Sequence, residues 1–261
     1  MKNIISFKDF LAEAEKKNLG LSLTKIKTFE TCPYRYYLQY IKKVKIPRGA
    51  YNPKFFKKGQ AFHKILDSLI KTGVACDFNS KTLGDEVKGI KNLCQKIYSN
   101  NFVQELLEYP HHSEYPFSIF VEDKKLRAIK KQDKTADFYG IIDFWAENGS
   151  ELYIVDWKTG KVAQDNEDTF LQVYLYAKAI QLLNNNKFSK INVGYYYVEH
   201  DTKLMKTLSV KELDEKIENL LEKAYSIPQS DDPSKFPAKP SGLCKWCPFG
   251  KESLGICEYE K

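Results

Sequence analysis

The chain has 261 residues, of which 43% are hydrophobic and 29% are charged, and this composition excludes a disordered, collagenous or fibrous protein. No apolar run approaches the roughly 20 residues that cross a bilayer, and residues 1–9 lack the apolar core of a secretory signal, so we expect a cytoplasmic protein without a membrane segment. The formal net charge of +7 fits a nucleic-acid-binding protein, although a lysine-rich solvated surface would give the same charge.

The N-terminal part of the chain predicts helices. Ser22 is suited to cap a helix that ends before the Cys32-Pro33 step, because a residue that precedes proline is pushed out of the helical region. The pattern from about 81 to 109 is also helical. Between them, an amphipathic helix that ends at Gly73 carries apolar residues at helical spacing: Phe62, Ile65, Leu66, Leu69 and Ile70.

Strands follow where β-branched and aromatic residues gather. The predicted elements are strands over 115–120, 139–146 and 152–157, a helix over 169–183, strands over 191–198 and 206–210, and a helix over 211–225. Helices on both sides of a mixed central sheet place the fold in the α/β or α+β class. No repeat or linker marks a boundary, so we expect 1–261 to form one domain, with a helical part over 22–80, a catalytic core over 110–200 and a cysteine-bearing tail over 233–261.

Two aspartates and a lysine stand on the predicted hairpin. If Asn148-Gly149 is a two-residue turn, Asp143 lies opposite Ile154 and Asp156 opposite Ile141. Asp143, Asp156 and Lys158 then share one face, with the carboxylates roughly 7–8 Å apart at the backbone. Two carboxylates can hold Mg²⁺, and a lysine can orient a water or stabilise developing charge, which favours phosphodiester hydrolysis. A strand-end salt bridge is the alternative, since Asp-x-Lys occurs four times in the chain.

Residues 140–143 and 154–160 resemble the core of the PD-(D/E)XK nucleases, in particular the RecB-like branch. Three more matches follow the order of that branch: a Gly-x-x-x-His segment over 59–63, Glu114 before the first core strand, and a Gln-x-x-x-Tyr segment over 172–176. The resemblance implies a restriction-endonuclease-like core and a metal-dependent deoxyribonuclease that uses Mg²⁺ or Mn²⁺. It also implies site residues: His63, Asp143, Asp156 and the Trp157 carbonyl as metal ligands, Lys158 as the catalytic lysine, Glu114 as a further catalytic residue, and Gln172 and Tyr176 as a pair that supports the site and contacts DNA.

Four of the six cysteines form a second pattern. Cys244, Cys247 and Cys257 leave a tetrahedral metal site one ligand short, and Cys32 could complete it. This arrangement resembles the iron–sulfur staple of AddB-type helicase–nucleases and of CRISPR-associated spacer-trimming nucleases, which implies a [4Fe-4S] cluster joining the two ends of the chain. Zn²⁺ is the alternative, because the last gap is longer than that pattern leads us to expect. The remaining two cysteines, Cys76 and Cys94, are interpreted as ordinary thiols.

Basic and aromatic residues suggest where DNA binds. Lys57 and Lys58 end a run over 42–58 that has seven Lys and Arg residues and no acid, and a second basic cluster lies over 124–134. Arg35 and Tyr36 suit phosphate contact and base stacking, although tyrosines beside a cluster ligand usually pack around it.

The resemblance implies exonuclease action on single-stranded DNA ends, in repair, recombination or CRISPR adaptation. Because the chain lacks the Gly-x-x-x-x-Gly-Lys-Ser/Thr motif of a motor, we expect either a stand-alone nuclease or the nuclease partner of another chain, such as a helicase or a CRISPR or recombination protein. For a phage protein, the location would be the host cytoplasm. The alternative function is a non-catalytic iron–sulfur or zinc module that binds nucleic acid or a partner nuclease, and the complete set of Asp143, Asp156 and Lys158 argues against it.

Overall fold

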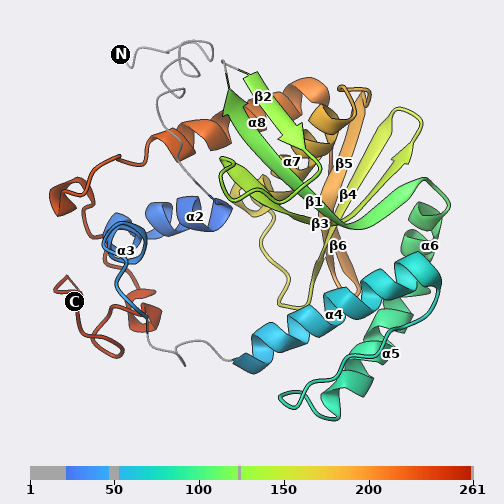
Figure 1. Ribbon diagram of the computed structural model, residues 1–261, viewed down its shortest axis with the longest axis horizontal. Helices are drawn as coiled ribbons and strands as arrows, with labels where there is room; N and C mark the ends of the chain where they lie inside the picture. The colour runs from blue at the N-terminus through green and yellow to red at the C-terminus, as the bar shows by residue number, and fades with distance from the viewer. Residues whose placement is uncertain (1–21, 47–52, 123–124, 260–261) are drawn as a thin grey trace. The chain divides into compact units, whose positions relative to one another are not determined.

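The computed structural model describes residues 22–46, 53–122 and 125–259, which are drawn in colour in Figure 1. The chain divides into two compact units. Of the described residues, the first contains 53–220 and the second combines 22–46 with 221–259. Some residues named in the sequence predictions lie outside the described residues: the N-terminal segment 1–9 and two members of the basic clusters, Arg48 and Lys124. In the described part of the chain, no helix combines the length and the apolar character needed to cross a membrane.

The sheet of the first unit has six strands in the order β2-β1-β3-β4-β5-β6 (Figure 1). Neighbouring strands are antiparallel except β4 and β5, which are parallel and are connected through a helix. This mixed sheet confirms the predicted α/β class. The strands are β1 (His111–Glu122), β2 (Lys125–Ile129), β3 (Phe138–Asn148), β4 (Glu151–Lys158), β5 (Lys190–Tyr197) and β6 (Thr202–Ser209).

Helices cover both faces of the sheet. They are α4 (Pro53–Thr72), α5 (Glu86–Tyr98), α6 (Asn101–Leu107), α7 (Glu167–Leu183) and α8 (Val210–Tyr225), whose last turn is counted with the second unit. Consecutive residues of a strand point to opposite faces. Tyr195 packs on Phe170 of α7, whereas the next residue, Tyr196, packs on Phe102 of α6. The α7 helix and the α4–α6 group therefore lie on opposite faces.

The hairpin between β3 and β4 differs from the predicted one by two positions. Asn148 pairs with Glu151, so the two turn residues are Gly149 and Ser150 rather than Asn148 and Gly149. Gly149 has a φ of +57°, and a positive φ at the first turn position alone is the requirement of a type II′ turn. The predicted pairing of Asp143 with Ile154 is therefore wrong, since Ile154 pairs with Trp145. The observed register, continued by one step past its last pair, brings Asp143 level with Asp156.

The edge strand β2 was not predicted. It pairs with the second half of β1, and its residues lie within the second basic cluster. Charged residues are common on edge strands because they discourage pairing with another chain. The basic run therefore belongs to a strand and its flanking loop, which explains part of its charge without a ligand.

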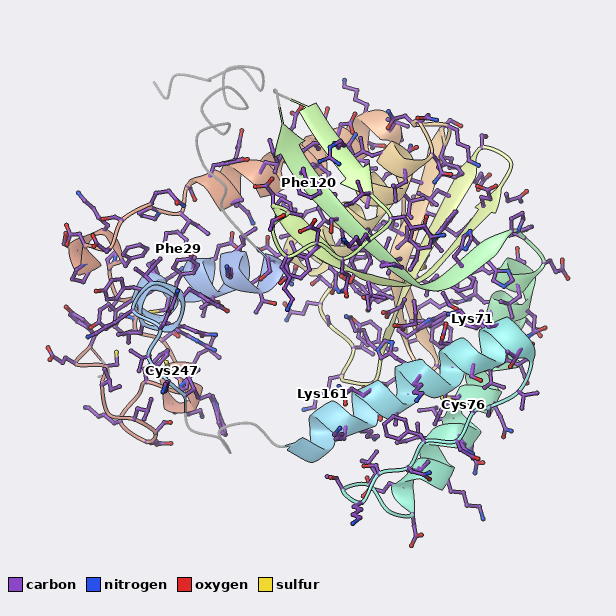
Figure 2. The ribbon with its side chains drawn as sticks, in the orientation of Figure 1. Phe29, Lys71, Cys76, Phe120, Lys161 and Cys247 are labelled. Carbon is purple, nitrogen blue, oxygen red and sulfur yellow. The ribbon has the colours of Figure 1, made fainter. Side chains whose placement is uncertain are left out.

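The second unit is built from short helices around aromatic side chains. Its elements are α2 (Leu23–Thr31), α3 (Pro33–Tyr36), the π-helical turn η1 (Tyr37–Ile41), η2 (Pro233–Lys235) and η3 (Cys244–Trp246). The Ser22 hydroxyl accepts a hydrogen bond from the Lys25 amide, which confirms the predicted cap of α2. Phe236 contacts the rings of Phe29, labelled in Figure 2, and of Tyr36. The predicted helical part over 22–80 is thus divided between the two units.

Candidate active site

Four elements of the first unit bring the predicted site residues together. The α4 helix carries His63, β1 carries Glu114, β3 carries Asp143, and β4 carries Asp156 and Lys158. Each strand of this group pairs with the next in the sheet, so their relative positions are fixed by backbone hydrogen bonds. The site therefore rests on regular secondary structure, which holds side chains more precisely than loops do.

Glu114 adopts an unusual backbone conformation. Its φ is +47°, in the left-handed region, which is uncommon for a residue with a side chain and costs about 1–3 kcal/mol. The flanking pairs, Ser113 with Phe144 and Tyr115 with Ile142, place Glu114 level with Asp143 on β3. This local turn within β1 accompanies the approach of the Glu114 carboxylate to His63.

One imidazole and two carboxylates form a group that can hold a metal ion. The Nδ1 atom of His63 lies 3.6 Å from a Glu114 oxygen and 3.6 Å from an Asp143 oxygen. One ligand atom from each of the three residues lies within 4.8 Å of the others. Carboxylate oxygens with one imidazole suit a divalent cation such as Mg²⁺ or Mn²⁺. The residues present therefore fit the metal that the sequence implied, and Glu114, predicted as a catalytic residue, is also a candidate metal ligand.

The two aspartates sit in an environment that disfavours their charge. Burial and the neighbouring Asp156 carboxylate raise the pKa of Asp143 well above its usual range. Burial also raises the pKa of Asp156, which is only 2% exposed. Asp143 accepts a hydrogen bond of 2.9 Å from the Trp157 amide, just beyond the last β3–β4 pair. A bound cation would relieve the repulsion between the two carboxylates.

Lys158 provides the positive charge of the site. Its ammonium lies 2.6 Å from an Asp156 oxygen and donates a hydrogen bond of 3.3 Å to Gln172. Burial alone would lower the pKa of Lys158, but the Asp156 and Asp143 carboxylates raise it above its usual value. The side chain is therefore an ammonium at neutral pH. It can donate hydrogen bonds and stabilise negative charge, but it cannot accept a proton.

The predicted Gln172-Tyr176 pair lies behind the lysine on one face of α7. The Gln172 amide donates a hydrogen bond of 2.6 Å to the Tyr176 hydroxyl and accepts one from Lys158 through its oxygen. Tyr176 is buried, and its ring packs edge-on against Phe117 at 5.5 Å. Burial, with the Asp156 carboxylate, raises the pKa of the Tyr176 hydroxyl. The pair thus holds Lys158 in place from the helix side.

Sequence reasoning missed Tyr195. This residue of β5 pairs with Asp156 in the sheet, and the Lys158 ammonium lies 5.2 Å from the centre of its ring. Its hydroxyl donates a hydrogen bond of 2.7 Å to the Thr169 carbonyl at the start of α7. The only feature of the sequence that could indicate Tyr195 is an aromatic run over 195–197, and such a run is equally typical of a buried core strand.

A cleft of about 970 Å³ opens beside the metal-binding group. Among the residues that line it, Lys57 was predicted from the sequence to bind DNA, whereas Gln60, Lys64 and Phe78 were not predicted as site residues. Gln60 and Lys64 lie on α4 one turn or less from His63, so helical spacing could have indicated them. Lys58 is predicted with Lys57, but its ammonium pairs with Glu199 at 2.8 Å. The cleft is lined by Lys57, Gly59, Gln60, His63, Lys64, Asp67, Phe78, Glu114, Ile141, Asp143 and Thr159.

A second cavity lies within the second unit and contains the four cysteines of the predicted cluster. Cys32, Cys244, Cys247 and Cys257 all line it and all are free thiols. The Cys244 sulfur accepts a hydrogen bond of 3.3 Å from the Ser241 amide. The first unit holds the other two cysteines, Cys76 and Cys94, and Cys76 is labelled in Figure 2. The structure thus brings together the same four cysteines as the sequence pattern.

The two residues of the second unit that were predicted to contact DNA, Arg35 and Tyr36, lie in different surroundings. Tyr36 is 5% exposed, and its ring packs against Phe29, Tyr40 and Phe236. It forms part of the aromatic core, in agreement with the packing role that the sequence left open. Arg35 lines the cysteine cavity.

Comparison with known proteins identifies the family. Residues 20–251 match the PD-(D/E)XK nuclease superfamily. The mitochondrial genome maintenance exonuclease 1 of Xenopus tropicalis is 26% identical over 155 residues, which cover 58% of this chain and 38% of that protein. The crystal structure of SSO0001 aligns over 98% of this chain and 95% of that chain at 15% identity, with a TM-score of 0.39. Because the family match spans most of the sequence, the chain belongs to the PD-(D/E)XK nuclease superfamily.

Proposed function

We propose that the protein is a metal-dependent deoxyribonuclease of the RecB-like branch that degrades single-stranded DNA from its ends. One observation carries the proposal. His63, Glu114 and Asp143 present ligand atoms within 4.8 Å of one another, and the Asp156–Lys158 ion pair lies on the neighbouring strand. Members of the superfamily use divalent metals, and this arrangement supplies ligands and a fixed cation in one place.

The residues divide the work of hydrolysis. His63, Glu114 and Asp143 would hold the divalent cation together with Asp156, and the Trp157 carbonyl stays a predicted ligand. When bound, such a cation lowers the pKa of a water and neutralises charge on the phosphoryl oxygens. Lys158 is paired with Asp156, and the neighbouring carboxylates raise its pKa in the metal-free fold, so its role is to orient the attacking water or to stabilise the negative charge that develops.

The cleft supports a single-stranded substrate. Lys57 and Lys64 place two cations on its wall, and Phe78 adds an aromatic ring beside Lys64, whose ammonium lies 5.9 Å from the ring centre. Lysines paired with aromatic rings are typical of grooves that track an unpaired strand, because every base offers a face for stacking. The relative from Xenopus tropicalis is named an exonuclease, which favours cleavage from ends.

End-labelled linear and covalently closed circular single-stranded DNA test this function directly. We expect Mn²⁺- or Mg²⁺-dependent loss of the linear substrate only. Lys158→Ala should abolish the loss, whereas Lys161→Ala should retain it, because Lys161 is an exposed residue on the loop after β4 (Figure 2). Digestion of the circle would show an endonuclease, and no digestion by folded, metal-loaded protein would overturn the proposal.

We further propose that the cysteine cavity holds a [4Fe-4S] cluster. Sulfurs that share one tetrahedral Zn²⁺ at about 2.3 Å would lie roughly 3.8 Å apart. Within the described residues, which include all six cysteines, no three cysteine sulfurs lie within 4.8 Å of one another. The proposal rests instead on the ligand set, because four cysteines line one cavity and thiolate-only ligation suits iron–sulfur chemistry.

Iron content and visible absorbance of anaerobically purified protein test the cluster. We expect brown protein with absorbance in the charge-transfer region, and loss of both colour and solubility in Cys32→Ser and Cys247→Ser. Cys76→Ser is the matched control, because its sulfur faces the Lys64 carbonyl at 3.6 Å in the other unit. Colourless protein that contains zinc would establish the alternative metal, and full absorbance in Cys247→Ser would refute the ligand assignment.

A further inference from the structure

We propose that Arg35 is a positioning residue for the metal cofactor of the second unit and that its Nε–H group donates a hydrogen bond to the sulfur atoms around the cluster. The inference rests on the [4Fe-4S] cluster proposed above. It assigns the guanidinium to the cofactor instead of to the DNA contact that the sequence predicts.

The position of Arg35 follows from the helix that carries it. Arg35 comes three residues after Cys32 and lies in α3, Pro33–Tyr36. Cys32 itself is the extended residue that precedes this short helix, so only two residues separate the ligand from the arginine. Both residues line the cavity that also contains Cys244, Cys247 and Cys257.

The Arg35 side chain has a donor without an acceptor. Its Nε atom is buried and has no hydrogen-bond partner in the part of the chain that the structure describes. Buried polar groups of native proteins are almost always hydrogen-bonded, and a donor on a charged group is the least tolerable exception. An anionic acceptor in the cavity would satisfy this group, and thiolate sulfurs that ligate a cluster are such acceptors.

Other residues of the cavity wall do not fill this role. Lys239 also lines the cavity, but its ammonium donates a hydrogen bond of 3.1 Å to the Glu30 carbonyl. Gln39 offers a rival explanation, because its buried Oε1 atom also lacks a partner and the residue follows Arg35 by four positions. Its amide nitrogen donates to the Tyr40 hydroxyl at 3.1 Å. A direct Arg35–Gln39 hydrogen bond would satisfy both orphan atoms without a cofactor, so Gln39 is the necessary control.

The reduction potential of the cluster reports on a hydrogen bond from Arg35. Hydrogen bonds to the sulfurs and nearby positive charge stabilise the reduced, more negative form, and both raise the reduction potential. Arg35→Gln should therefore shift the potential to more negative values. Arg35→Lys keeps a positive charge but loses the Nε–H donor, so it should give a smaller shift in the same direction.

The experiment is a redox titration of anaerobically purified full-length protein, followed by visible absorbance, for wild type, Arg35→Gln, Arg35→Lys and Gln39→Leu. We expect the two Arg35 variants to shift as described and Gln39→Leu to match wild type. Unchanged potentials in both Arg35 variants, or an equal shift in Gln39→Leu, would overturn the proposal. Wild-type protein without iron would instead refute the cluster itself, so the two failures are distinguishable.

A second measurement covers variants that fail to fold. The chain contains three arginines, Arg35, Arg48 and Arg127, so ¹⁵N-arginine labelling is selective. Pulsed electron paramagnetic resonance of the reduced wild-type cluster should show coupling to a ¹⁵N nucleus, and Arg35→Lys should remove it. Absence of the coupling in labelled wild type would contradict a hydrogen bond from Arg35.

Discussion

The two metal-binding regions of this chain are held in different ways. The carboxylate site lies on paired strands and a long helix, and its charged groups already meet in ion pairs and hydrogen bonds. The cysteine cavity lies among 3₁₀ turns and loops of a unit that joins residues 22–46 to residues 221–259. Its four cysteines are free thiols that line one cavity.

The two regions should differ in how far their folding depends on a bound metal. The sheet fixes the carboxylates whether or not a cation is present, and the metal-free site therefore bears the repulsion between Asp143 and Asp156. The second unit is a small fold with few regular elements, and such units commonly rely on metal binding for stability. We expect the first metal to serve chemistry and the second to serve structure.

Metal removal should give the largest contrast. EDTA should stop cleavage completely and reversibly while the first unit stays folded, because the sheet needs no cation. Oxidative loss of the cluster should expose residues 22–46 and 221–259 to proteolysis without exposing the sheet. Limited proteolysis with mass spectrometry of the fragments measures both effects. Cuts inside β3 or β4 after EDTA treatment would break the comparison.

Asp143→Asn should remove activity and stabilise the metal-free protein. The pKa of Asp143 is raised by burial and by Asp156, so its charged form is destabilising in the fold. Each tenfold weakening of its acidity corresponds to about 1.4 kcal/mol, which moves Tm by about 2–4 °C in a chain of this size. The asparagine oxygen can still accept the hydrogen bond from Trp157.

The pH dependence of this effect has a defined sign. An acid with a raised folded pKa contributes stability that is present below its unfolded pKa, about 3.9, and that is lost as pH rises through the folded pKa. The Tm advantage of Asp143→Asn should therefore grow as pH rises from the unfolded pKa towards the folded pKa, and it should close on acidification. Asp77→Asn is the control, because Asp77 is exposed and pairs with Lys91 at 2.6 Å. A lower Tm for metal-free Asp143→Asn at pH 7 would contradict the electrostatic account.

Lys57 and Lys58 should differ in DNA binding. Lys57 lines the cleft, whereas the Lys58 ammonium forms an ion pair with Glu199. If Lys57 contacts one phosphate, Lys57→Gln should reduce the slope of log K against log salt by about 0.7 for a single strand. Lys58→Gln should change it less. Fluorescence anisotropy with labelled single-stranded DNA at several salt concentrations, in Ca²⁺ to slow cleavage, makes the comparison, and equal slopes would remove Lys57 from the DNA path.

Tyr176→Phe should have the smallest effect. It removes a hydroxyl that accepts from Gln172 and leaves the packing of the ring against Phe117 intact. A neutral hydrogen bond contributes about 0.5–1.5 kcal/mol, so turnover should fall roughly 2-fold to 10-fold, since 1.36 kcal/mol corresponds to a factor of ten. Steady-state kinetics on the linear substrate measures the loss, and a fall as large as that of Lys158→Ala would mean that Tyr176 itself takes part in the chemistry.

Local patterns predicted most helices and strands, because caps, prolines and hydrophobic periods act within a few residues. The Ser22 cap and the Gly73 end of α4, where φ is +71°, are examples. The hairpin register was wrong by two positions because Asn-Gly is the stronger signal, whereas Gly149 serves as the first turn residue. A shift of two positions keeps each side chain on its original face of the sheet. The prediction that Asp143 and Asp156 share one face therefore did not depend on the exact register.

Long-range placement could not be predicted in the same way. The alternation of Lys125, Leu126 and Arg127 carries a strand signal, but the charges were interpreted as a surface cluster. The division of the chain at residue 52 depends on contacts between segments some two hundred residues apart, such as Phe29 with Phe236. The cysteine pattern was the exception, because metal-ligand spacing relates distant segments within the sequence itself.

Mn²⁺ binding and DNA cleavage, measured on the same preparations of wild type, Asp143→Asn and Lys158→Ala, test the central claim most directly. Isothermal titration calorimetry gives the binding and end-labelled single-stranded DNA gives the cleavage. The account predicts that Asp143→Asn loses both, whereas Lys158→Ala keeps Mn²⁺ binding and loses cleavage by about 10²–10³-fold. Wild-type cleavage by Lys158→Ala, or unchanged Mn²⁺ affinity in Asp143→Asn, would contradict it.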